Sequence, residues 1–326
     1  MAFRDFIGQR NLVDRLRRAI SGNTLSHSYV FSGPEGIGKK TLARAFVSEL
    51  VCTMPVDEGP CEKCNACKMF HAGIPTDYLW LQPEKDHISV DDIRNIQNDI
   101  IIRPLYSDRK IYVIPDGESM TAQAQNCLLK VLEEPPEYAV IIILSVTSET
   151  LLPTVMSRVI HYELDKYNRE DLSRILVQKD INISQEYLNA IYGYSGGVPG
   201  KAVELIKSEQ FVQMREDMIR LILNLNDGKL NIINWADYFE NQKEEITTLL
   251  NILQLFYRDA LMIKNSKDGA VINIDKVDIV RKIQDQLSER KMIRNIQCIS
   301  ETQVNIKRNA NYKLALENML LYITED

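Results

Sequence analysis

The segment Gly33-Pro34-Glu35-Gly36-Ile37-Gly38-Lys39 constrains the fold of this chain more than any other part of its sequence. It follows an apolar run at residues 27–31 that predicts a buried strand, and it precedes a helical pattern at residues 39–52. In this context a glycine-rich loop presents backbone N–H groups and a helix N-terminus to phosphate, and its lysine reaches the β and γ phosphates of a nucleotide. The sequence therefore predicts a P-loop that includes Gly33, Gly36, Gly38 and Lys39, rather than a glycine turn without a ligand.

The residue after the P-loop lysine departs from the pattern of a working nucleotide site. A Ser or Thr hydroxyl should follow and bind Mg²⁺, but Lys40 stands there and the hydroxyl comes one place late, at Thr41. A shift of one residue on a helix turns the side chain by about 100°, so Thr41 is not expected to take over. Lys40 could instead act as a surrogate cation at the metal position, and the sequence leaves nucleotide binding open.

A second departure follows the apolar strand predicted at residues 110–114. Asp116 lies where an aspartate would organise the metal, but Gly117 occupies the place of the catalytic base. Glu118 is adjacent, yet a neighbour in sequence is expected to point elsewhere. Since a positioned general base contributes roughly 10²–10⁴ in rate, hydrolysis at this chain's own site is not expected.

Strand and helix patterns alternate in the first half of the chain and give way to helices in the second. Such alternation predicts a parallel sheet covered on both faces. Ser89 is the predicted N-cap of a helix that ends before Pro104. The predicted division is an α/β domain at residues 1–165, a small helical domain at 166–207 and a C-terminal helical domain at 208–326. The predicted strands are 27–31, 77–81, 110–114, 139–146 and 159–163, and the later helices are 169–179, 184–194, 199–208, 211–225, 234–264, 277–290 and 293–324.

Four cysteines cluster just after the P-loop helix, with the spacing C-x8-C-x2-C-x2-C, at Cys52, Cys61, Cys64 and Cys67. Four thiolates suit a closed, tetrahedral, structural zinc site. Two alternatives stay open: His71 could replace Cys52 as the fourth ligand, and the C-x2-C-x2-C spacing also occurs in iron–sulfur proteins. Cys127 and Cys298 are isolated and are interpreted as small buried hydrophobic residues.

Charge and hydropathy limit the classes of function. The net charge is −6 and no long run of Lys and Arg occurs, which argues against tight, autonomous DNA binding. The longest apolar run, residues 139–144, is far shorter than the roughly 18 residues that a membrane span needs. With no signal-peptide pattern at its beginning, the chain is expected to be cytoplasmic, with no membrane partner and no disulfides.

Several segments together resemble the AAA+ subunits of bacterial DNA polymerase III clamp loaders, the family of delta-prime and gamma/tau. The approach to the P-loop is similar, as is a four-cysteine module inserted after the P-loop helix. Ser157-Arg158-Val159 resembles the family's Ser-Arg-Cys motif, with Val159 in place of the Cys. The approach to the P-loop is residues 25–33, and the remaining similar segments are residues 126–136 and 196–202.

The resemblance implies an AAA+ domain, a helical lid and a C-terminal collar that packs in a hetero-pentamer with gamma/tau and delta subunits. It implies that the assembled ring loads the sliding clamp on primed DNA. It also implies that Arg158, which by itself would be interpreted as a solvated or salt-bridged side chain, acts as an arginine finger on a neighbouring subunit's ATP. Active gamma/tau subunits carry an Arg where this chain has Gly200, and the chain stops near residue 326. Both differences favour the delta-prime branch.

Two alternatives remain at the level of sequence. The chain could be an active ATPase of the gamma/tau type, which requires Thr41 and Glu118 to take over the displaced roles. It could also be a zinc-dependent nucleic-acid-binding module, against which the acidic net charge argues.

Overall fold

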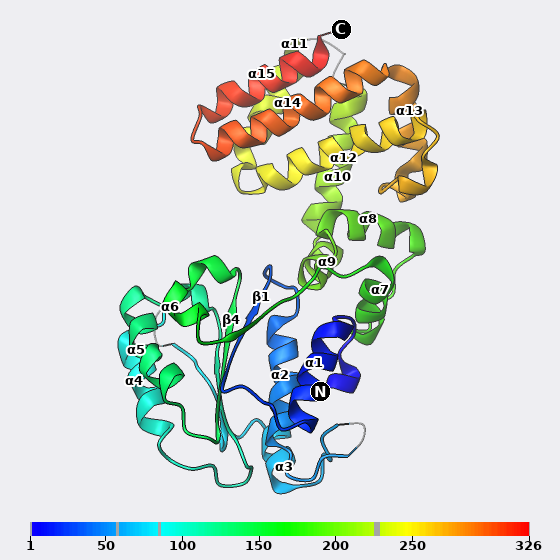
Figure 1. Cartoon of the computed structure of the whole chain (residues 1–326). Coiled ribbons are helices and arrows are strands. Elements are labelled where there is room, and N and C mark those ends of the chain that lie inside the picture. Colours follow the sequence, from blue (N-terminus) through cyan, green and yellow to red (C-terminus); the bar gives the residue numbers. More distant parts are fainter. Residues whose placement is uncertain (1, 57–58, 84–85, 225–228, 326) are drawn as a thin grey trace. The chain divides into compact units, whose positions relative to one another are not determined.

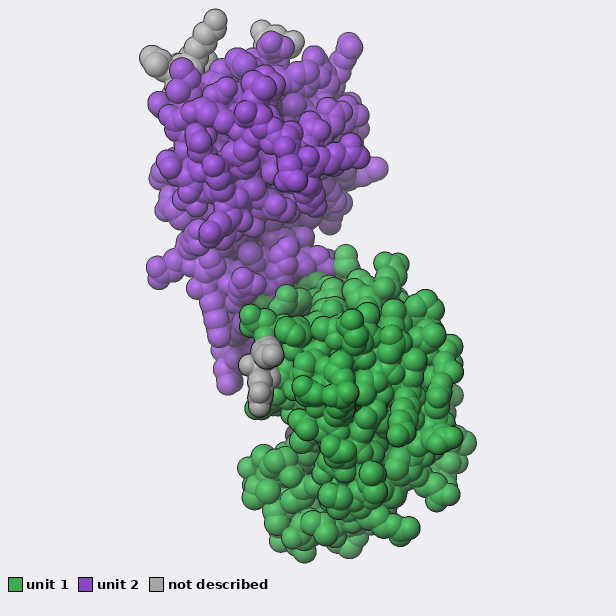
Figure 2. All heavy atoms as spheres, turned by 90° about the vertical axis from the view of Figure 1, so that its left-hand side faces the viewer, with its two compact units in different colours: residues 1–175, 198–200 green, residues 176–197, 201–326 purple. Residues whose placement is uncertain are grey.

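The computed structural model describes residues 2–56, 59–83, 86–224 and 229–325. The chain divides into two compact units, residues 1–175 with 198–200 and residues 176–197 with 201–326 (Figure 2). The predicted division into three domains stays a prediction.

A parallel sheet of five strands forms the centre of the first unit (Figure 1). All pairings are parallel and the strand order is β2-β3-β4-β1-β5. The inner strands are buried along their whole length because helices cover both faces, whereas β5 lies at an edge. The predicted α/β fold class is therefore confirmed. The strands are β1 (Ser28–Ser32), β2 (Tyr78–Trp80), β3 (Lys110–Ile114), β4 (Ala139–Ser145) and β5 (Ile160–Glu163).

Alternate residues of β1 enter two separate hydrophobic cores. Tyr29 and Phe31 pack with α1 (Arg10–Ser21) and α2 (Lys39–Val51), and Val30 packs with helices on the opposite face. The helices of that opposite face are α4 (Val90–Asp99) and α5 (Ala122–Glu133). Two further helices of the first unit, α3 (Asn65–His71) and α6 (Pro153–Met156), are short.

The starts of α4 and α5 follow from their capping residues. Ser89 caps α4, as predicted, and also forms a capping box with Asp92, and Thr121 caps α5. The helix that is predicted to end before Pro104 ends at Asp99. The sequence analysis missed α1, whose N-cap residue, Gln9, has a left-handed backbone and makes no side-chain capping bond.

The second unit consists of helices and short 3-10 turns in its described part, and no strand occurs there, as predicted. The long helix α12 packs against α10, α13 and α14. Two predicted helices are each divided in two: residues 234–264 by a 3-10 turn at Lys243–Glu245, and residues 293–324 near Asn309, whose φ is 59°. The helices are α7 (Arg169–Gln178, which crosses the boundary between the units), α8 (Gln185–Ser195), α9 (Pro199–Lys207), α10 (Glu209–Asn224), α11 (Lys229–Asn241), α12 (Ile246–Lys264), α13 (Val277–Gln286), α14 (Glu289–Lys307) and α15 (Tyr312–Thr324). Leu225, the predicted end of one of them, lies outside the described residues.

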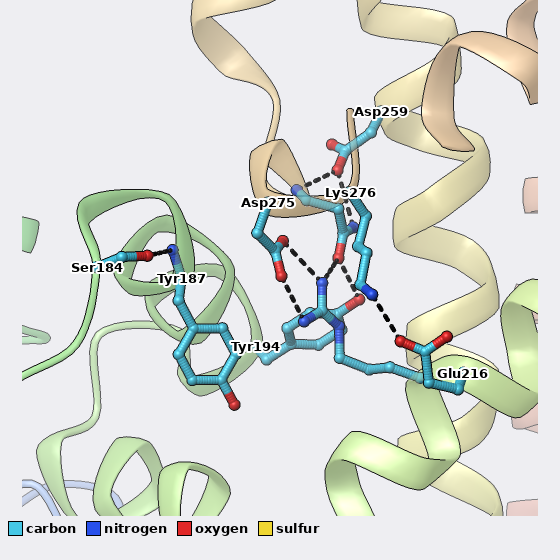
Figure 3. Close-up of polar contacts among 9 residues, drawn as sticks. Ser184, Tyr187, Tyr194, Glu216, Asp259, Asp275 and Lys276 are labelled. Carbon is cyan, nitrogen blue, oxygen red and sulfur yellow. Dashed lines mark hydrogen bonds and ion pairs between the residues drawn. The ribbon is translucent and has the colours of Figure 1, made fainter. Parts of the chain in front are cut away.

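A buried polar network joins α8, α10, α12 and the 3-10 turn Ile274–Lys276 in the second unit (Figure 3). The guanidinium of Arg215 donates two bonds to the carboxylate of Asp275, at 2.8 and 2.9 Å. The amide oxygen of Asn273 accepts from both Arg215 and Tyr194 at 2.8 Å, and its Nδ2 donates to Asp259 at 2.9 Å. These bonds connect α8, α10 and α12 to one another through the 3-10 turn.

Among the described helices, none has both the length and the apolar character that crossing a membrane demands.

Candidate functional site

The glycine-rich loop lies between β1 and α2, as its sequence predicts. Gly33, Gly36 and Gly38 have φ values of 145°, 76° and 111°, which side chains rarely adopt. Lys39 is the first residue of α2, so the loop ends at a helix N-terminus. The local geometry is that of a P-loop.

The Lys39 ammonium lies inside the loop and binds the loop's own backbone. Its Nζ donates to the carbonyl oxygens of Gly33, at 2.5 Å, and Pro34, at 3.1 Å. Partial burial lowers the pKa of Lys39, while the negative charges of Glu118 and Asp116 oppose that shift. The loop's own carbonyl groups thus occupy two of the three donors of the Lys39 ammonium.

Lys40 faces the carboxylate that the sequence analysis assigned to the metal. Its Nζ lies 3.4 Å from Oδ2 of Asp116, and both side chains are more than half exposed. The structure thus places a positive charge beside Asp116. No hydrogen bond joins the Thr41 hydroxyl to Asp116 in the part of the chain that the structure describes.

Gly117 leaves no space for a catalytic side chain. A Cβ atom there would lie 2.7 Å from Cγ2 of Ile143 and 3.0 Å from the carbonyl oxygen of Leu144. By contrast, Glu118 is directed toward the end of β4, where its carboxylate accepts the N–H of Val146 at 3.1 Å. Its charge also acts on Lys39, and whether Glu118 can serve as a base stays a prediction.

The backbone at Gly200 packs directly on the P-loop within the first unit. The Gly200 N–H donates to the carbonyl oxygen of Gly36 at 2.9 Å. A Cβ at position 200 would lie 2.6 Å from Cα of Gly36. The family resemblance implies an arginine at the corresponding position of active subunits, and this arrangement has no space for one.

Tyr167 is a part of this region that the sequence analysis missed. Its ring packs so closely on Gly8 that a Cβ there would lie 2.5 Å from Cε1 of Tyr167, and its hydroxyl is near Gly38. Burial raises the pKa of the Tyr167 phenol to about 12, so the hydroxyl stays protonated. Nothing in the sequence indicated that a residue so far from Gly8 would contact it.

The four cysteines of the predicted zinc module come together. Their sulfur atoms all lie within 4.8 Å of one another, and among the described residues this is the cluster that could hold a metal ion. Cys52 follows α2, Cys64 is the N-cap of α3 and Cys67 lies within α3. His71, the alternative ligand, is exposed at the end of α3 and is not part of the cluster.

Backbone N–H groups point at three of the four sulfur atoms. They belong to Cys61, Cys64 and Cys67 and lie 3.2, 3.3 and 3.4 Å from the sulfur atoms of Cys52, Cys61 and Cys64. Burial opposes ionisation of Cys64, but hydrogen bonds from Cys67 and Thr53 outweigh it and lower the pKa of that thiol to about 6. Burial raises the pKa of Cys67. Because a metal needs all four thiolates, the donor set and its N–H bonds fit zinc.

Arg158 lies on the surface between α6 and β5, and its polar partners come from α5, α6 and the adjoining turn. Its NH2 group forms an ion pair with Glu133 at 2.8 Å. Its NH1 group donates to the carbonyl oxygen of Thr154 at 2.9 Å and to Oγ of Ser157 at 3.1 Å. None of these partners belongs to the P-loop, so the structure does not bring Arg158 to the chain's own phosphate site.

Two family models match the chain. One, described as "DNA polymerase III, delta subunit", covers residues 8–168, and the other, described as "DNA polymerase III, delta subunit, C terminal", covers residues 209–325.

The curated relatives are also subunits of DNA polymerase III. The chain is 26% identical over 322 residues to DNA polymerase III subunit delta' of Bacillus subtilis, covering 97% of this chain and 96% of that protein. It is 30% identical over 259 residues to DNA polymerase III subunit gamma of Buchnera aphidicola from Schizaphis graminum, covering 77% and 70%. It is 24% identical to subunit tau of Bacillus subtilis, covering 99% of this chain but 61% of that protein.

Proposed function

Because the chain belongs to the family of DNA polymerase III clamp-loader subunits that includes delta-prime and gamma/tau, we propose that it acts as a delta-prime-type subunit. In this role it is a largely non-hydrolysing member of a hetero-pentamer with gamma/tau and delta subunits. The assembled ring places the sliding clamp on primed DNA. The alignment with a delta' protein over nearly all of both chains supports this proposal.

The geometry of the P-loop region is the observation that carries the non-hydrolysing role. Lys40, with its charge beside Asp116, stands where a metal-binding hydroxyl is needed. Gly117 has no space for a base, and Gly200 none for an arginine. Loss of a base alone costs roughly 10²–10⁴ in rate, and the three departures act on different parts of the reaction.

In the proposed role Arg158 serves the ATP of a neighbouring subunit. Its side chain is on the surface, away from the P-loop of its own chain, which a finger acting in trans requires. An arginine at the transferred phosphoryl group stabilises the charge of the transition state and contributes roughly 10³–10⁵ in rate in the enzymes where it is known.

The proposal also includes a structural zinc ion held by Cys52, Cys61, Cys64 and Cys67. When bound, zinc supplies a tetrahedral cross-link and no chemistry of the reaction. The chain's own part is to hold the four sulfur atoms together with N–H bonds and to connect the end of α2 to α3.

Steady-state ATP turnover by the purified chain tests the non-hydrolysing role. We expect turnover below about 0.1 s⁻¹, since typical enzymes run at roughly 1–10³ s⁻¹. Turnover above this value that is abolished by Lys39→Ala would support the alternative, an active ATPase of the gamma/tau type. The negative charge of Glu118, which opposes the lowering of the pKa of Lys39, is the observation in favour of that alternative.

Assembly is tested by co-purification with gamma/tau and delta subunits and by measurement of the mass of the complex. We expect a hetero-pentamer that contains this chain. A chain that stays monomeric with both partners present contradicts the proposed role.

A further inference from the structure

Glu133 forms an ion pair with Arg158, although a glutamate at this position does not stabilise its own helix. Glu133 is the last residue of α5, where the partial negative charge of the helix end disfavours a carboxylate and favours basic residues. Its carboxylate instead forms an ion pair at 2.8 Å with the guanidinium of Arg158, which follows the short helix α6 in the chain. The pairing thus brings together two residues that are 25 positions apart.

The guanidinium of Arg158 is folded back on its own chain by three contacts. NH1 binds the Thr154 carbonyl and the Ser157 hydroxyl, and NH2 binds Glu133. Of the three partners, only Glu133 carries a charge. Arg158 is 36% exposed and Glu133 is 50% exposed, so solvent and other charged groups can reach the pair.

We propose that Glu133 is a positioning residue that acts as a latch: it holds the Arg158 guanidinium against α5 and competes with the phosphates of a neighbouring subunit's ATP. This inference rests on the proposed role of Arg158 as a finger in trans. To reach a phosphoryl group in another subunit, the guanidinium leaves Glu133 and exchanges one anionic partner for another. Removal of the Glu133 charge therefore favours the engaged position of Arg158.

The size of the effect follows from the exposure of the pair. Ion pairs at this exposure are weak because water screens them. Glu133→Gln keeps the shape of the side chain and removes its charge. We expect it to raise kcat/KM for ATP in the reconstituted loader by roughly two- to fivefold at low salt. The gain should shrink as salt is raised, because ions screen exposed charges.

The test measures ATP turnover of loaders assembled with wild-type chain, Glu133→Gln, Arg158→Ala and the double variant. Glu134→Gln is the matched control, because it removes the neighbouring exposed carboxylate on the same turn. We expect Glu134→Gln to match the wild type. In the Arg158→Ala background, Glu133→Gln should not change ATP turnover, because the guanidinium that Glu133 binds is absent.

The possible outcomes test the latch role of Glu133 separately from the finger role of Arg158. If Arg158→Ala turns over ATP as fast as the wild type, the finger role itself fails. If Arg158→Ala is slow but Glu133→Gln equals or falls below the wild type, the finger stands and the latch is wrong. A gain from Glu133→Gln that persists without Arg158 also overturns the latch.

Discussion

On the scale of single residues, Gly117 and Gly200 stand at positions that have no space for a Cβ atom. The first packs on β4 and the second on the P-loop, and a Cβ atom at either position would lie less than 3.0 Å from its nearest neighbour. The sequence shows only that a glutamate and an arginine are missing from these places. The structure adds that neither could be restored without moving backbone or a packed side chain.

We predict that Gly117→Ala destabilises the chain by roughly 1–3 kcal/mol, the usual cost of overpacking a filled core. The free energy of unfolding in urea measures the change. Gly269→Ala is the matched control, because no atom lies within 4 Å of a Cβ at that position. An unchanged free energy for Gly117→Ala would contradict the close packing against Ile143.

On the scale of elements, the cysteine cluster and the polar network each connect segments that are separate in the sequence. The cluster connects the end of α2 to α3 through sulfur atoms, and the network connects α8, α10 and α12 through buried charges. The cluster depends on ionised thiolates, so acid acts on it. The network contains buried charges, so single substitutions act on it strongly.

We predict that acid releases zinc from the cluster. The depressed pKa of Cys64 means that its contribution to stability is fully present above about 9, its ordinary value, and is lost as the pH falls through about 6. Binding of zinc also requires deprotonation of Cys67, whose pKa is raised, so acid competes with the metal. A chromogenic chelator in a titration from about pH 8 to about pH 5 measures release.

Two cysteine variants make the zinc prediction specific. Cys64→Ser should lose the metal, and Cys127→Ser, outside the cluster, should keep about one zinc ion per chain. Wild-type chain purified without bound zinc, or Cys64→Ser with unchanged zinc content, would refute the site.

We predict that Arg215→Ala destabilises the chain by roughly 3–5 kcal/mol, because it leaves the carboxylate of Asp275 without its buried partner. Arg215 is 4% exposed, and its loss also removes a donor from Asn273. Chemical denaturation measures the change. Arg220→Ala is the control: this arginine pairs with Asp217 on the helix surface, and its loss should cost less than about 1 kcal/mol. Equal effects of the two substitutions would show that the network contributes little.

On the scale of the whole molecule, charge limits what the chain can do alone. It carries 39 Lys and Arg against 45 Asp and Glu, so the counterion release that drives non-specific DNA binding is small. This agrees with a subunit that meets DNA through its assembly.

We predict that the isolated chain binds primed DNA no more tightly than the micromolar range, about 10⁻⁶ M or weaker at physiological salt. Fluorescence anisotropy with a labelled primer–template measures this, and addition of gamma/tau and delta subunits should tighten the binding. Nanomolar binding by the chain alone, lost on removal of zinc, would instead support the zinc-dependent nucleic-acid-binding alternative.

Some predictions at the level of elements failed where the sequence signal was weak. The pattern over residues 293–324 is helical throughout, yet the chain breaks at Asn309, which adopts a left-handed backbone, and α15 restarts with Asn311 as its cap. The two asparagines were the available signal, since this residue tolerates positive φ and caps helices. The break at residues 243–245 has no comparable signal.

The sequence by itself determined the features that depend on neighbours along the chain: the buried strands, the capped helices, the P-loop and the spacing of the four clustered cysteines. These features follow from the periodicity of apolar residues, from the backbone conformations that particular residues prefer, and from contacts between residues close in sequence. Only the tertiary structure decided that Lys40 pairs with Asp116, that Gly200 packs on Gly36 and that Arg158 is held by Glu133. Each pair lies far apart in sequence, and its contact is set by how the strands and helices pack, which no local pattern encodes.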